Sequence, residues 1–345
     1  MNRKSWIFAL LVIVVAGCEP AYAQKVRFIK DLSIKSNEND EKTSFLSVEN
    51  VNADLHGNIY ALASRECKIQ VYNPKGEYIR TIGKKGQGPG ELEMPFSVLL
   101  DKDDHIYVFD FNKMAFVVFD PQGRYLKNLS TKGKFQSFPD RIFIDSRGNF
   151  VIGYESMSGD SFRISRFGRE FDSGEDLYAK TGMVSFLHKP GGVLTQAPFP
   201  PGMVWTLDEK DNLYVCFNQT YDIEVHSPDL KLIRTISRKV VRDEVSRAEI
   251  EESVKRSKGL LTAGDFPKYK PALRRMFIVS GRLFVLVKRM DEAYLFHVFD
   301  QEGDFVEELK LDFQPWIFKN GFVYAIKANP DLSECEVMRF KVEFK

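Results

Sequence analysis

Short runs in which hydrophobic and polar residues alternate recur along the whole chain, and most of them end in a turn. Alternation places the apolar side chains of an extended strand on one face, so each run predicts a β-strand. One run occurs six times as a turn residue followed by apolar and aromatic residues; five copies align directly, and the sixth, at Asn320, fits with its turn residue displaced by one. Its copies are GNIYALA at Gly57, DHIYVFD at Asp104, GNFVIGY at Gly148, DNLYVCF at Asp211, GRLFVLV at Gly281 and NGFVYAI at Asn320. This repetition predicts one structural unit used six times.

Each repeat unit holds four predicted strands. A shorter apolar stretch precedes the recurring run, and an alternating strand such as AFVVFD or LFHVFD follows it. In four units this third strand ends in a turn such as NPKG or DPQG, whose Pro, Asn, Asp and Gly residues favour tight turns, and a fourth strand comes next. The spacing of about forty to seventy residues between units suits a blade of about forty residues. We therefore predict an all-β fold, a six-bladed β-propeller of four-stranded antiparallel blades.

The two ends of the chain are predicted to close the ring together. The sixth unit runs out at Lys345 after its third strand, and the segment KVRFIKDLSI at residues 25–34 has the pattern of an outer strand. We expect this segment to complete the last blade, because the pairing removes an exposed sheet edge.

The glycine-rich stretch IGKKGQGPGELEMP, residues 82–95, raises the question of a phosphate-binding loop. Such a loop has the form G-x-x-x-x-G-K-[ST] and leads into a helix. Here no Lys-Ser or Lys-Thr pair follows the later glycines, and the next segment, FSVLLDKDDHIYVFD, has the pattern of strands. The stretch is therefore interpreted as a crossing from the outer strand of one blade to the inner strand of the next, where glycine permits positive φ.

The segment GKKGQGPGELEMPFSVLLDKDDHIYVFDFNKMAFVVFDPQGRYL resembles the NHL repeat, and Asp110 and Asn112 fall on the Asp and Asn of that pattern. The first unit departs from the pattern, with Ala63 and Arg65 near those places. Over about residues 25–345 the chain is similar to exported bacterial six-bladed propeller proteins with NHL-like repeats. This resemblance implies the fold and leaves the function open.

The N-terminal segment, residues 1–23, predicts export. Arg and Lys precede an apolar run at residues 6–15, which is too short to span a bilayer permanently. The tetrapeptide VAGC resembles a lipobox and predicts lipidation of Cys18 and an anchor in the outer or cytoplasmic membrane. The tripeptide AYA at residues 21–23 instead resembles a signal-peptidase site, which predicts a soluble periplasmic or secreted protein. In both cases the propeller is expected to occupy residues 24–345.

Charge and cysteine content narrow the function classes. The 49 Lys and Arg nearly balance the 48 Asp and Glu, whereas nucleic-acid binders usually carry a basic excess. Cys67, Cys216 and Cys335 form neither a C-x-x-C motif nor a dense framework, so we expect buried thiols, with a Cys67–Cys335 bridge as the alternative. We expect a monomer that binds no nucleic acid and meets the membrane only through a lipid anchor.

Two connectors are longer than a blade crossing needs, and long loops in compact domains are usually functional or disordered. The first, at about residues 171–203, is expected to contain an irregular outer strand and a Gly/Pro-rich loop. The second, at about residues 238–271, contains one predicted helix in SRAEIEESVKRSKG, which Ser246 caps and Glu249 completes as a capping box. Blade crossings and the loops between second and third strands share one side of a propeller. Both insertions are therefore expected on that side, near the axial opening.

This insertion-bearing face is the predicted binding site, since propeller function resides in loops. Four candidates fall on the insertion-bearing face itself. His188 lies in the first insertion, and Trp205 and Trp316 begin inner strands. The candidate binding residues are Arg65, Asp110, Asn112, Lys113, His188, Trp205 and Trp316.

No motif indicates catalysis or a cofactor. Lactonase-type propellers and some NHL-class lyases hold a metal at the axis, but His56 and His105 are expected on the opposite face and His226 and His297 away from the axis. Asp101, Asp145 and Asp208 recur at strand ends, which favours a role in turns. The first hypothesis is a non-enzymatic module that binds an unknown protein or glycan of the cell envelope. The alternative is a metal-assisted hydrolase or lyase acting on a small molecule.

Overall fold

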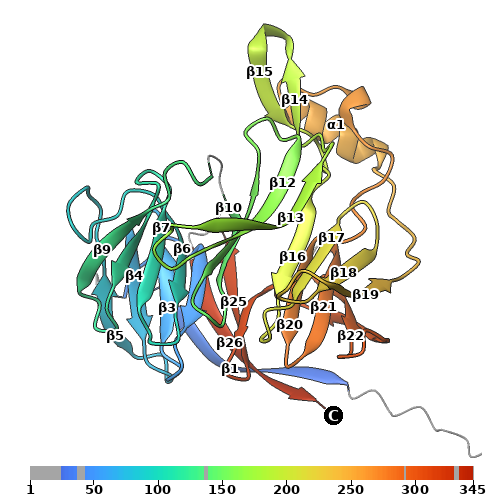
Figure 1. Ribbon diagram of the computed structural model, residues 1–345. Coiled ribbons are helices and arrows are strands. Elements are labelled where there is room, and N and C mark those ends of the chain that lie inside the picture. The colour runs from blue at the N-terminus through green and yellow to red at the C-terminus, as the bar shows by residue number, and fades with distance from the viewer. Residues whose placement is uncertain (1–24, 37–42, 136–138, 291–292, 330–333, 345) are drawn as a thin grey trace, which may run out of the picture.

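The computed structural model describes residues 25–36, 43–135, 139–290, 293–329 and 334–344. Within these ranges the strands form six four-stranded antiparallel sheets and one separate hairpin, which confirms the six-bladed propeller (Figure 1). The blades, each given from its inner to its outer strand, are: blade 1, β2 (Asn50–Ala53), β3 (Ile59–Ala63), β4 (Lys68–Tyr72) and β5 (Tyr78–Ile82); blade 2, β6 (Pro95–Leu100), β7 (Ile106–Asp110), β8 (Ala115–Phe119) and β9 (Tyr125–Ser130); blade 3, β10 (Pro139–Ile144), β11 (Phe150–Glu155), β12 (Ser161–Phe167) and β13 (Gly174–Thr181); blade 4, β16 (Met203–Leu207), β17 (Leu213–Phe217), β18 (Asp222–His226) and β19 (Leu232–Ser237); blade 5, β20 (Arg275–Val279), β21 (Arg282–Arg289), β22 (Tyr294–Phe299) and β23 (Phe305–Leu311); blade 6, β24 (Pro315–Lys319), β25 (Phe322–Asn329), β26 (Glu334–Phe344) and β1 (Val26–Lys35).

The position of a strand within its blade explains its composition. Every residue of β3 and of β8 is buried, because neighbouring blades cover both faces of a middle strand. Along the outer strand β9 only Leu129 is buried, since the rim of the disc faces solvent. Continuous apolar runs such as IYALA therefore belong to middle strands, and mixed runs such as YLKNLS to outer ones.

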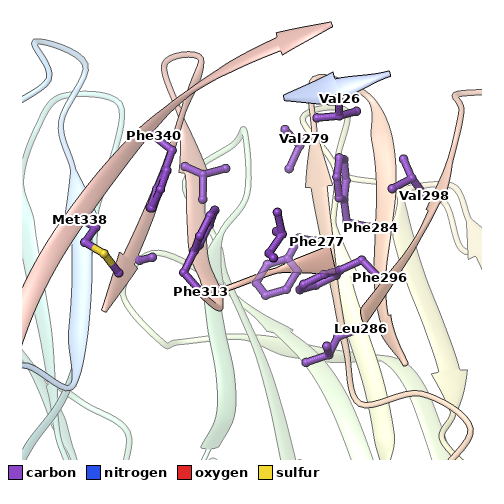
Figure 2. Packing of buried hydrophobic residues seen from close by; sticks show 13 residues of the cluster. Val26, Phe277, Val279, Phe284, Leu286, Phe296, Val298, Phe313, Met338 and Phe340 are labelled. Atoms are coloured by element: carbon purple, nitrogen blue, oxygen red, sulfur yellow. The ribbon is translucent and has the colours of Figure 1, made fainter. Parts of the chain in front are cut away.

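Six hydrophobic cores lie between neighbouring blades and follow each other around the ring. Large aromatic rings fill them; Phe116 of blade 2 and Phe150 of blade 3, for example, have centroids 4.5 Å apart. Figure 2 shows the core between blades 5 and 6, where Phe313 and Phe340 stack at 3.8 Å. Aromatic residues suit these cores because one ring spans the gap between two packed sheets.

The N-terminal strand closes the ring, as the sequence predicts. β1 pairs antiparallel with β26 from Val26 opposite Phe344 to Lys35 opposite Glu336. Val26 packs in the core between blades 5 and 6, and Figure 2 shows it beside Val279 and Phe284. The Arg339 guanidinium also donates to both oxygens of Asp31, at 3.1 and 2.9 Å. First and last segments of the described chain thus form one sheet.

Recurrent aspartates shape the turns between first and second strands. One oxygen of Asp101 accepts from the amides of Asp103 and His105, each at 2.9 Å. The same pattern, with amides two and four residues further on, occurs at Asp54, Asp145 and Asp208. The prediction of turn-forming aspartates is confirmed.

Both insertions lie on one side of the disc (Figure 1). In the first, the outer strand β13 is irregular as predicted, because its pairing with β12 shifts register between Tyr178 and Asp176. Where a Gly/Pro-rich loop was expected, a hairpin follows: β14 (Phe186–Lys189), the 3₁₀ turn η1 (Pro190–Gly192) and β15 (Val193–Gln196). The second holds the predicted helix α1 (Arg247–Arg256) and a 3₁₀ turn, η2 (Ala263–Asp265). Ser246 and Glu249 form the predicted capping box. Lys189 joins the two insertions through Asp265 at 2.5 Å.

The targeting segment and its two cleavage signals lie outside the described residues. Among the residues that the structure describes, no helix is long and apolar enough to cross a bilayer.

Candidate functional site

A cavity of about 1080 Å³ runs along the axis of the disc. All six inner strands, β2, β6, β10, β16, β20 and β24, contribute to its wall. The lining includes Arg65 and Lys85 from loops on the insertion-bearing face and Asp208 and Asn320 from turns on the opposite face. The cavity therefore extends over the full length of the inner strands.

Two arginines and one aspartate occupy the wall where the inner strands begin. Asp140 and Arg141 are consecutive residues of β10, and Arg275 is the first residue of β20, two blades away. Arg141 Nη1 donates to the carbonyl oxygens of Trp205 at 3.0 Å and Met276 at 3.1 Å. Arg141 thereby links blade 3 to the inner strands of blades 4 and 5. Burial lowers the pKa of Arg141, and Asp140 opposes this.

Arg275 is held by aromatic rings. Its guanidinium carbon lies 4.7 Å from the ring centroid of Trp316 and 5.1 Å from that of Phe277. Within the part of the chain that the structure describes, its guanidinium donates no hydrogen bond to the protein. Burial and, secondly, Arg141 hold the pKa of Arg275 well below its usual value, against the effect of Asp140. The positive charge of Arg275 is thus poorly compensated by the protein.

Asp140 is fixed by a tryptophan. Trp205 Nε1 donates to Asp140 Oδ2 at 3.1 Å, and burial raises the pKa of this carboxyl although Arg141, Arg275 and Trp205 oppose the shift. The Trp205 indole lies against Gly153 of β11, where a Cβ atom would come within 2.4 Å of its Nε1. A side chain at position 153 would therefore displace the indole that orients Asp140.

A further cation lies toward the opposite face. Lys319 ends β24 and lines the same cavity, and burial lowers the pKa of its amine against the effects of Asp104 and Asp54. Cationic groups therefore occur at both ends of the cavity wall, on Arg275 and on Lys319.

Comparisons with known proteins agree with this architecture. Residues 38–157 match the model of the DUF5128 family, described as a 6-bladed beta-propeller. The chain is a six-bladed β-propeller. A protein described as exported, from Bacteroides fragilis NCTC 9343, is 13% identical to this propeller, with a TM-score of 0.57 over 94% of this chain and 96% of that chain. A member of the DUF4221 family from Bacteroides vulgatus ATCC 8482 is 12% identical, with a TM-score of 0.58 over 94% and 100%.

At this level of identity the solved structures show the fold of the propeller alone. A virginiamycin B lyase from Staphylococcus aureus is 10% identical, with a TM-score of 0.49 over 91% of this chain and 99% of that chain, and this likeness carries no argument about chemistry. No curated protein matches the sequence. The resemblance to the NHL repeat stays a prediction.

Three of the predicted binding residues meet at the cavity of the propeller. Trp205 is fully buried behind the wall, Trp316 is half-buried in it, and Arg65 is exposed at the insertion-bearing end. Both tryptophans contact the charged groups, Trp205 through Asp140 and Trp316 through Arg275.

The other predicted residues lie elsewhere. Asp110 is fully buried and has a structural role, because its carboxylate accepts from the amides of Glu93 at 2.6 Å and of Met94 and Lys113 at 3.2 Å. It thereby fixes the glycine-rich crossing between blades 1 and 2. Asn112 is exposed beside it, and Lys113 Nζ donates to the Gln87 carbonyl. His188 is exposed on β14.

Sequence reasoning missed Asp140, Arg141 and Arg275. A signal exists in DRIFI and RRMFI, where charged residues begin an inner strand. In an isolated sequence such charges suggest only a strand end exposed to solvent. The structure places them together because the Arg141 side chain reaches past blade 4 to the inner strand of blade 5, which begins with Arg275.

Among the described residues, the acid–histidine group with metal-ligand spacing is Asp101, Asp103 and His105. It lies in a turn between first and second strands, opposite the insertions and outside the cavity lining. Within this group, the two carboxylate oxygens of Asp101 already accept hydrogen bonds, one from two backbone amides and the other from the Tyr107 hydroxyl.

Proposed function

We propose that this protein is an exported, non-enzymatic binding module that receives its ligand in the axial cavity, through the insertion-bearing face. The observation that carries this proposal is the cavity itself, in which aromatic and charged side chains from several blades converge. Small-molecule sites are typically concave, with an apolar lining and a few placed polar groups. The ligand is a small molecule, or the end of a protein or glycan chain of the cell envelope.

The two insertions support an entrance on their side of the disc. The hairpin β14–β15 and α1 project from the face that carries Arg65 and Lys85, and the pair Lys189–Asp265 holds the insertions together. The alternative, a metal-assisted hydrolase or lyase, has less support because the group Asp101, Asp103 and His105 lies at the opposite face.

A thermal-shift experiment tests the cavity as a binding site. Small-molecule fractions of the native cell envelope are added to the purified protein, and a fraction containing the ligand should raise the melting temperature by mass action. The shift should disappear in Trp316→Ala, which opens the cavity wall, and persist in Val241→Ala, a fully exposed position of the second insertion. An equal shift in Trp316→Ala and the parent protein would exclude the cavity.

We propose further that Cys18 is lipidated and anchors the module in the envelope, on the strength of the VAGC tetrapeptide. Mass spectrometry of the mature N-terminus should detect a lipid on Cys18. A mature chain that begins at Gln24 without lipid would contradict the anchor.

A further inference from the structure

Three charged groups of the axial cavity face its interior instead of protein partners: Arg141 and Arg275 are half-buried, and Asp140 is exposed. Among the described residues, no ion pair joins Asp140 to Arg141 or Arg275, and Arg275 makes no hydrogen bond to protein. Removing a charge from water is costly unless opposite charges or hydrogen bonds replace the lost hydration. Arg275 is half-buried, stacks on two aromatic rings and directs no N–H group at a described protein acceptor, which makes it a candidate for a ligand-binding role.

The aromatic neighbours determine which part of Arg275 is available. A guanidinium that stacks on an aromatic ring uses its face and leaves the N–H groups at its edge free. Trp316 and Phe277, at 4.7 and 5.1 Å, hold the group by such contacts. The five donors of the planar fork remain free to bind the two oxygens of a carboxylate or phosphate.

The surroundings of Arg275 favour an anion with an apolar body. Phe143 packs edge-to-face on Trp205 at 5.2 Å, and both line the cavity together with Phe277 and Trp316. Arg141 adds a second positive charge close to Arg275, since both guanidinium carbons lie over the ring of Phe277, at 5.6 and 5.1 Å from its centroid. One wall of the cavity thus offers cationic donors next to aromatic surface.

We propose that the axial cavity binds an organic anion, whose carboxylate or phosphate group is held by the Arg275 fork while its apolar or aromatic body contacts the ring-lined wall. This inference rests on the proposed function, because it names the chemical class of the ligand for that cavity. Trp205 and Gly153 act as positioning residues, since they set the orientation of Asp140 beside the two arginines.

The tryptophans of the chain provide a direct readout. The sequence holds three: Trp6 in the expected targeting segment, and Trp205 and Trp316 at the cavity. In a Trp6→Phe background all tryptophan emission comes from the cavity.

Titrations use three probes of similar size: benzoate, phenyl phosphate and the neutral benzamide. Benzoate or phenyl phosphate should change the emission saturably and bind at least about tenfold more tightly than benzamide, because hydrogen bonds to charged groups are the strong ones. The tighter of the two anions identifies the preferred head group.

Substitutions assign the effect to Arg275. Arg275→Gln should weaken anion binding at least about tenfold and leave benzamide binding unchanged, whereas Arg275→Lys, which keeps the charge but not the fork, should give an intermediate loss. Arg247→Gln is the matched control, because it removes one positive charge from the exposed face of α1 and should bind like the parent protein. Arg275→Gln should melt no lower than the parent, since it removes an uncompensated charge, and this excludes unfolding as the cause.

Two results would overturn the inference. Equal binding of benzamide and the anions would show that the cavity does not select for charge, while the cavity would still stand as the binding site. The absence of a saturable response to either anion up to about 50 mM, a range in which a single charge-assisted contact is measurable, would overturn the assignment of Arg275. A failure of the proposed function itself can be told apart from these results. In that case, no envelope fraction would raise the melting temperature of the parent protein more than that of Trp316→Ala.

Discussion

At the scale of single residues, charged side chains in this propeller divide into those that the fold satisfies and those that it does not. Asp110 is fully buried, and backbone amides from both sides of a blade crossing bind its carboxylate. Arg275 is half-buried at the cavity, where it contacts aromatic faces instead of hydrogen-bond acceptors. Each stands at one end of an apolar strand, Asp110 as the last residue of β7 and Arg275 as the first of β20, so the sequence context does not distinguish them. The difference emerges only from the partners that the fold brings to each.

Asp110→Asn tests the structural role. Asparagine keeps the size but replaces one accepting oxygen with an NH₂ group, so a buried amide such as that of Glu93 loses its partner. We expect a loss of about 2 kcal/mol in the free energy of unfolding, measured by urea denaturation. Asp229→Asn, at an exposed turn position, should change the stability by less than about 0.5 kcal/mol. Equal stability of the two variants would contradict the structural role of Asp110.

At the scale of elements, α1 shows how a helix with no buried residue is held in place. Its capping box satisfies the first amides, and Lys270 Nζ binds Glu249 at 2.6 Å from the segment that leads into blade 5. In the same way, Lys189 of the first insertion forms an ion pair with Asp265 of η2. Hydrogen bonds from these lysines, and then from the backbone amides of Ser246 and Thr262, lower the pKa of Glu249 and of Asp265 to about 2, against the raising effect of burial. The second insertion is therefore attached mainly by polar contacts.

Acidification should release this insertion before the blades unfold. A carboxyl whose pKa is lowered in the folded state contributes stability above its ordinary value, here 4.5 for Glu249 and 3.8 for Asp265, and loses it as the pH falls toward 2. Amide exchange protection of residues 247–256, corrected for the intrinsic rate, should fall between about pH 5 and pH 2 while β-strand protection persists. A Lys189→Met, Lys270→Met variant lacks both contacts and should show little pH dependence in that window. Equal pH dependence in the parent and the double variant would refute this account.

The elements also show how far sequence reasoning reached. Strand order, turns and the helix cap follow from local patterns, because an Asp that binds amides two and four residues ahead, or Ser246 with Glu249, acts within a few residues. The hairpin β14–β15 was missed because its residues, with Pro190 and two glycines at the tip, suggest a loop. The cavity charges were missed for another reason: Arg141 and Met276 are distant in sequence, and no local pattern states that they meet.

At the scale of the whole molecule, stability depends on a ring of six cores with no free end. The core between blades 5 and 6 includes Val26, and the core between blades 6 and 1 includes Ile34, so one strand from the N-terminus contributes to two cores. Pairing of β1 with β26 also covers the edge that blade 6 would otherwise expose. Closure by β1 therefore stabilises the ring in two ways, by burying apolar side chains and by pairing backbone hydrogen-bonding groups.

Removal of residues 26–35 should lower the melting temperature by more than about 10 °C, because it exposes both cores and a strand edge. A pair of point variants gives a finer test within the same strand. Ile34→Asp places a charge in a core and should destabilise the protein by more than about 3 kcal/mol, whereas Ile29→Asp, at a position that is 46% exposed, should have little effect. Unchanged melting after deletion of the strand would count against closure by β1.

The pairing of Val26 with Phe344 has a consequence for orientation in the cell. Phe344 ends the third strand of blade 6, so β1 begins on the side of the disc away from β14, β15 and α1, as Figure 1 shows. The few residues between Cys18 and Val26 reach at most about 28 Å. A lipid on Cys18 would tether the disc by that underside, and the mouth beside the two insertions would point away from the bilayer. An anchored form would sample solutes of the aqueous compartment rather than molecules embedded in its own membrane.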